Sequence, residues 1–153
     1  MKDILDIHSH TIASGHAYNT LYEMARAAAD NGMELFGSSD HGPALPGSSH
    51  EMYFCNFKSI PKELFGMRLI MGCELNILDY KGTLDLKEWL LKRVDYGIAS
   101  IHDLCYKTGS REENTAAAVN AMKSPYVQVI GHPDNANIPL DYTALVKGAR
   151  EHH

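Results

Sequence analysis

The chain has 153 residues, which is enough for one domain with one substantial core. Its 14 lysines and arginines and 19 acidic residues give a net charge of −5, and neither sign is gathered in a long block. This balance argues against nucleic acid as the main partner and leaves a small polar or phosphorylated substrate open.

The first part of the chain predicts two strands and a helix. Residues 3–8 (DILDIH) and 34–41 (ELFGSSDH) are strand-like, and residues 19–33 between them are helix-like. Asn19 or Thr20 is a plausible cap for this helix, with Glu23 placed to close a capping box. The loop over 41–64 begins with two prolines and two glycines and continues into an aromatic-rich, helix-like half.

The rest of the chain continues the alternation. In order, we predict a strand over 67–76, a turn at Lys81-Gly82, a short helix over 86–93, a strand over 95–102, a helix over 110–124 with Ser110 as cap and Glu113 at capping-box spacing, a strand over 126–133 and a helix over 141–153. Trp89 is predicted to lie in the core. Strands separated by helices predict an α/β fold with a parallel sheet buried on both faces.

The three cysteines, Cys55, Cys73 and Cys105, are far apart and include no CxxC pair. They indicate neither a disulfide framework nor a thiolate zinc site, which fits a reducing cytoplasm. No apolar stretch reaches the length of about 18 residues that a membrane span needs. The N-terminal MKDILDIHSH has histidines where a signal peptide would be apolar, so we expect a cytoplasmic protein without a membrane partner.

Residues that can bind metal follow every predicted strand. They are His8, His10, His41, Glu74, His102 and His132, and His16 follows the first pair by six residues. Because the carboxyl ends of parallel strands share one edge of a sheet, we expect these side chains to converge. Alternate residues of a strand point the same way, so His8 and His10 can face one cation. The set exceeds what one tetrahedral ion needs, so at least two ions are predicted.

The ligand types narrow the choice of metal. Imidazole and carboxylate suit Zn, with Mn or Fe as alternatives, and Glu74 can bridge two ions through its two oxygens. Asp6 is a candidate partner for a histidine ring. Asp103 and Asp134, close after the last two histidines, are candidates for orienting ligands or transferring a proton to a leaving group. Ser9 is interpreted as a spacer rather than an attacking group.

With these residues the chain resembles the PHP (polymerase and histidinol phosphatase) superfamily, most closely its bacterial metal-dependent phosphatases. The resemblance covers essentially the whole chain and rests on five segments in the expected order: DIHSHTIASGHAYNT, SSDHGP, GCELNI, SIHD and IGHPDN. It implies a distorted (β/α)7 barrel with three metal ions and hydrolysis of phosphomonoesters by metal-activated water. The implied ligand sets are His8, His10 and Glu74 for the first ion, Glu74, His102 and His132 for the second, and His16 with His41 for the third.

The chain departs from the family pattern at its C-terminal end. The last two family ligands, an Asp and a His separated by one residue, would follow a sixth strand and have no counterpart here. We therefore expect residues 1–153 to be a single PHP domain that forms the N-terminal part of a longer barrel, with about five of its seven strands. The unpaired edge of such a sheet is expected to favour association of copies.

Two other functions stay open. An amidohydrolase also begins with HxH after its first barrel strand, but it would want a carbamylated lysine or a glutamate on a middle strand, and Glu74 is ambiguous in that respect. A non-catalytic, metal-binding or regulatory module is the other alternative, because the last family ligands are absent. The sequence does not name the phosphate ester.

Overall fold

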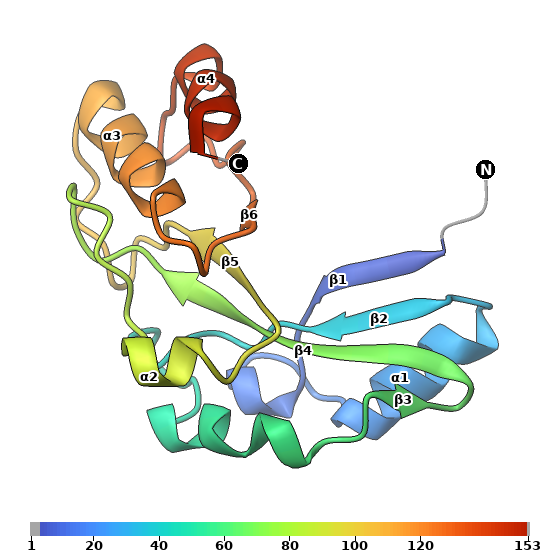
Figure 1. Cartoon of the computed structure of the whole chain (residues 1–153). Helices are drawn as coiled ribbons and strands as arrows, with labels where there is room; N and C mark the ends of the chain where they lie inside the picture. The colour runs from blue at the N-terminus through green and yellow to red at the C-terminus, as the bar shows by residue number, and fades with distance from the viewer. Residues whose placement is uncertain (1–3, 153) are drawn as a thin grey trace.

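Five parallel strands form one curled sheet in the computed structural model, which describes residues 4–152 (Figure 1). The strands, in spatial order, are β1 (Leu5–Ser9), β2 (Leu35–Ser38), β4 (Met67–Asn76), β5 (Tyr96–Ser100) and β6 (Val129–Ile130). A short strand, β3 (Glu63–Leu64), pairs antiparallel with β4. The arrangement confirms the predicted α/β class and matches an incomplete (β/α) barrel.

The helices alternate with these strands along the chain. They are α1 (Leu21–Asp30), α2 (Glu88–Leu91), α3 (Arg111–Met122) and α4 (Tyr142–His152), with 3-10 helices η1 (Ile12–Ser14) and η2 (Glu51–Ser59). Both predicted capping boxes are present: the Thr20 and Ser110 hydroxyls accept from the backbone N–H three residues later, and Glu23 and Glu113 accept in return. These reciprocal bonds satisfy orphan N–H groups and so fix where α1 and α3 begin.

Apolar side chains from the helices and the sheet form the core. In Figure 1, α1, η2 and α2 lie on one side of the sheet, and α3 with α4 lies beside β5 and β6. The aromatic-rich half of the long loop forms η2, which buries Phe54 and Phe57 edge to face with ring centroids 5.4 Å apart. Strand β4 is buried along almost its whole length, as expected for a central parallel strand.

Two sequence predictions differ from the structure. Trp89 is 46% exposed, because the single turn of α2 turns Leu90 and Leu91 into the core and leaves the indole outside, near the Arg93 guanidinium. The predicted strand over 126–133 shrinks to Val129–Ile130, which pairs only with β5. The chain then leaves the sheet at Gly131, where a Cβ would collide with the Ser100 hydroxyl.

Candidate metal centre

Glu74 occupies the centre of the carboxyl edge of the sheet. It lies two residues before the end of β4 and is 1% exposed. Its backbone N–H donates to the Asp40 carbonyl at 3.1 Å, its carbonyl accepts from Gly42 at 2.8 Å, and it pairs with Ile98 on β5. The main chain therefore holds this carboxylate from both neighbouring strands.

Five imidazoles surround the Glu74 carboxylate, one or two from each of the other parallel strands. Oε2 lies 3.2 Å from Nε2 of His8, 3.1 Å from Nε2 of His10 and 3.0 Å from Nδ1 of His41, and Oε1 lies 3.4 Å from Nε2 of His102 and 2.8 Å from Nε2 of His132. Side chains from both ends of the chain thus meet at one carboxylate. We call these six residues the Glu74 cluster.

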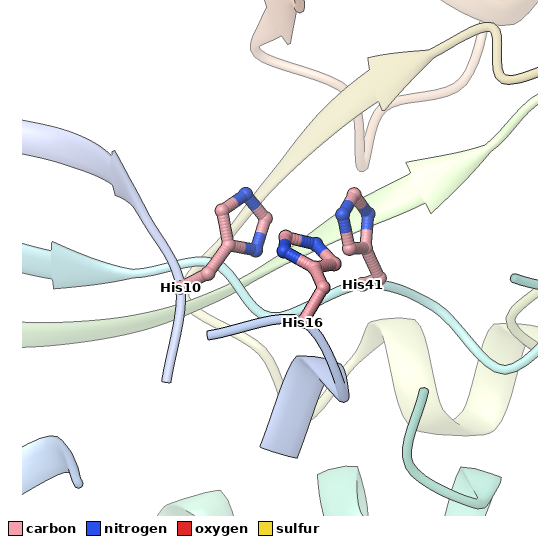
Figure 2. Close-up of side chains that lie close together, drawn as sticks. All are labelled: His10, His16 and His41. Carbon is pink, nitrogen blue, oxygen red and sulfur yellow. The ribbon is translucent and has the colours of Figure 1, made fainter. Parts of the chain in front are cut away.

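His16 joins the cluster through its neighbours. Figure 2 shows its ring beside those of His10 and His41, and the ring centroids lie 5.2 Å and 4.8 Å away. Ligand atoms within 4.8 Å of one another form three groups: His10, His16 and His41; His8, Glu74 and His132; and His41, Glu74 and His102. All seven predicted ligands therefore come together. His10 lies with His16 and His41 in one of these groups, and it also shares Oε2 of Glu74 with His8.

The cluster carries an ionised carboxylate in a largely buried position. Burial raises the pKa of Glu74, but protons held between this carboxylate and the imidazoles of His10, His102, His132 and His41 outweigh burial and hold the pKa far below its usual range, and a metal ion in their place would act in the same direction. Burial lowers the pKa of the His41 imidazole. The contact with Glu74 raises the pKa of His132.

The centre of the cluster offers donor atoms that a divalent metal ion can use. Nδ1 of His41 and Oε2 of Glu74 are buried and 3.0 Å apart, yet neither has a correctly directed hydrogen bond to any residue described. Both atoms thus direct lone pairs into shared space. Ligands about 2.0–2.2 Å from a tetrahedral zinc ion lie roughly 3.3–3.6 Å from one another, and the N–O distances around Glu74, from 2.8 Å to 3.4 Å, lie at or just below this range.

The other predicted site residues have different positions. Asp6 accepts from the backbone N–H of His8 at 3.0 Å, so its contact with a histidine is through the main chain. The Ser9 hydroxyl donates to the Gly37 carbonyl at 2.9 Å, which supports its interpretation as a spacer. Asp103 and Asp134 are exposed and lie outside the three groups of ligand atoms among the residues described.

Four polar residues that the sequence analysis did not select support the histidines. Asp40 accepts from Ser14, whose hydroxyl lies beside the ring of His10. Asp85 accepts from Asn76, whose amide lies beside the ring of His102. The sequence positions of two of these residues could have indicated their role. Asp40 directly precedes His41, and Asn76 lies two residues after Glu74, on the same face of β4.

The metal-free protein should show opposite pKa shifts at two of its histidines. His132 should titrate above the ordinary imidazole pKa of about 6.5 and His41 below it. Because the pKa of His132 is higher in the folded than in the unfolded chain, protonated His132 stabilises the fold. This contribution is complete below the pKa of the unfolded state, and it is lost as the pH rises through the pKa of the folded state. NMR titration checks this, and Glu74→Gln should lower both values. A His132 pKa unchanged by Glu74→Gln would contradict the assigned cause.

Comparison with known proteins places this chain among phosphatase-like sequences. The family model described as PHP domain matches residues 6–149. The chain is 48% identical, over 99% of its own length, to a probable phosphatase of Clostridium novyi and to another of Acetivibrio thermocellus. It is 46% identical to a probable phosphatase of a Thermoanaerobacter species. It spans only 62% to 63% of the length of these relatives.

Two further observations bear on the protein's surroundings. Among residues 4–152, every helix is too short or too polar to cross a membrane. The three cysteines are free, and Cys73 is buried beside Glu74 in sequence.

Proposed function

The chain belongs to the PHP domain family, and from this premise we propose that it carries the metal site of a phosphatase-type hydrolase acting on phosphomonoesters. The observation that carries the proposal is the Glu74 cluster, in which five imidazole nitrogens lie within 3.4 Å of one buried carboxylate. The names of the relatives support the phosphatase class.

We assign the metal-holding role to the seven clustered residues: His8, His10, His16, His41, Glu74, His102 and His132. Two or three divalent ions are proposed, because each Glu74 oxygen meets a different set of imidazoles. Zinc suits this donor set, with manganese or iron as alternatives. When bound, such ions lower the pKa of water for attack on phosphorus and neutralise charge on the phosphoryl oxygens.

The chain's own residues prepare the site for this chemistry. The buried Glu74 carboxylate supplies negative charge that attracts cations, and the surrounding imidazoles supply neutral donors in fixed positions. No side-chain nucleophile is needed, because water would attack the phosphorus. The Ser9 hydroxyl donates to the Gly37 carbonyl and is not available for attack. We propose that Asp103 or Asp134, both exposed near the cluster histidines in sequence, orients ligands or passes the proton released by the attacking water to the leaving alkoxide.

Metal analysis and a phosphatase assay test this proposal together. We expect the purified chain to retain two to three equivalents of divalent metal by elemental analysis and to hydrolyse p-nitrophenyl phosphate faster than bis(p-nitrophenyl) phosphate. The diester control distinguishes a monoesterase from a diesterase. Bound metal without hydrolysis of either ester would favour a non-catalytic metal-binding module, and a chain without metal would refute the proposal.

A further inference from the structure

The Ser14 hydroxyl connects a buried carboxylate to a cluster histidine. Ser14 Oγ lies 2.7 Å from Asp40 Oδ1 and 3.0 Å from His10 Nδ1, and it accepts the backbone N–H of His41 at 3.1 Å. A hydroxyl has one proton to donate, and an ionised carboxylate can only accept. The Ser14 proton therefore points to Asp40. Toward His10 the hydroxyl can only accept, so Nδ1 of His10 carries a proton.

Asp40 is held too firmly to change this arrangement. Its two oxygens also accept from the backbone N–H of Thr11 at 2.7 Å, the Thr11 hydroxyl at 2.8 Å and the Tyr53 hydroxyl at 2.8 Å, and the residue is 1% exposed. With these donors in place, the carboxylate stays an acceptor toward Ser14. The direction of the hydrogen bond between Ser14 and His10 follows.

The Asn76 amide makes a second connection of the same kind. Its Nδ2 donates to Asp85 Oδ2 at 2.6 Å and to the Gly42 carbonyl at 3.2 Å, and its Oδ1 lies 2.7 Å from His102 Nδ1. Because both partners of Nδ2 are acceptors, the orientation of the amide is fixed. Oδ1 must accept from the ring, so Nδ1 of His102 is protonated as well.

Both imidazoles then present the same atom to Glu74. A neutral ring protonated at Nδ1 has its lone pair on Nε2. The Nε2 atoms of His10 and His102 lie 3.1 Å and 3.4 Å from the two Glu74 oxygens. Lone pairs facing a carboxylate repel it unless a cation lies between them, so each connection favours a metal-binding ring over a hydrogen-bonding one.

We propose, resting on the metal-dependent hydrolysis proposed for this chain, that Asp40 through Ser14 and Asp85 through Asn76 are positioning residues for His10 and His102. They hold both rings in the form protonated at Nδ1 and leave Nε2 free to bind metal beside Glu74. The two connections come from different loops and reach opposite oxygens of the same carboxylate. The ring form is set before any ion arrives.

The ring form can be measured without metal or substrate. Imidazole ¹⁵N shifts of the metal-free protein, at a pH of about 8.5 where ordinary histidines are neutral, report which nitrogen carries the proton. His10 and His102, assigned from single His→Gln variants, should both show protonated Nδ1. Protonated Nε2 on either ring would overturn that half of the proposal, whether or not the protein is a phosphatase.

Ser14→Ala and Tyr53→Phe form a matched pair. Each removes one hydroxyl from Asp40, but only Ser14 also contacts an imidazole. Ser14→Ala should shift the His10 ¹⁵N signals toward the form protonated at Nε2 and weaken zinc binding by roughly 10- to 100-fold. Tyr53→Phe should leave the ¹⁵N signals and the zinc affinity near those of the wild type. Equal losses in the two variants would show a merely structural role and refute positioning.

Asn76→Ala and Cys105→Ala repeat the comparison at His102. Both side chains reach the same point, because Cys105 Sγ lies 3.3 Å from Asn76 Oδ1, but only Asn76 bonds the ring. Asn76→Ala should move the His102 signals and weaken zinc binding, and Cys105→Ala should move neither. A wild-type protein with both predicted ring forms but no affinity for zinc would refute the proposed function and leave the assignment of ring forms standing.

Discussion

Replacing Glu74 by glutamine is expected to lower the proposed phosphomonoesterase activity by about three orders of magnitude or more and to release most of the metal proposed to bind there. The substitution keeps the volume of a side chain that is 1% exposed, so packing changes little. It removes the negative charge on which both halves of the cluster converge. A metal ion stabilises the charge of the transition state by several kcal/mol. Losing this stabilisation together with the metal corresponds to the expected fall in rate.

Glu74→Gln also changes the hydrogen-bonding capacity of the cluster centre. An amide has one acceptor oxygen and one NH₂ group, so at least one set of imidazoles would face a donor where it now faces an oxygen. Rings that accept from this NH₂ group could not use the same lone pair for a cation. The variant should therefore lose metal even at concentrations that saturate the wild type.

The control for this experiment is Glu63→Gln on β3. It removes the same charge from an exposed position far from the carboxyl edge of the sheet. Metal content by elemental analysis and the rate on p-nitrophenyl phosphate should match those of the wild type. Full metal content in Glu74→Gln, or equal losses in both variants, would contradict the central role given to Glu74.

The sequence predicted the parts of this site that depend on strand ends. His8, His10, His41, His102 and His132 follow apolar runs and Glu74 lies near the end of one, and the rule that parallel strands end at one edge was enough to bring His8 and His132 to the same place. The predicted strand over 67–76 matches β4 in full, because a central strand is buried along its length and its apolar run has no competing interpretation. The caps of α1 and α3 were predictable from local hydrogen bonding alone.

The remaining features depend on contacts between distant residues. Asp85 contacts Asn76 because the turn after β4 brings the chain back beside that strand. The spacing of the two residues in the sequence does not predict this contact. The approach of the His16 ring to that of His10 follows from the bend of the chain at η1, a 3-10 helix that the sequence analysis did not predict. Trp89 was misplaced because a single helical turn gives too few residues to define an apolar face.

Adding zinc to the metal-free protein is expected to raise its melting temperature by roughly 10 °C when free metal is about 1,000 times the dissociation constant. Only the folded chain gathers the seven ligands, which lie on separate strands and loops. Binding therefore stabilises the native state by about 4 kcal/mol, less any binding to histidines of the unfolded chain. Circular dichroism melts across a zinc titration, reversed by a chelator, measure the shift.

The size of this shift should grow as pH rises from about 6 to 8. Metal must displace protons from the imidazoles, and the contact with Glu74 raises the pKa of His132 in the metal-free state, so this ring holds its proton to higher pH. Glu74→Gln should show a much smaller shift at every pH, and Glu63→Gln a shift equal to that of the wild type. A melting temperature independent of zinc concentration would mean that the clustered histidines do not form a metal site, since ligands brought together only by folding cannot bind without stabilising the fold.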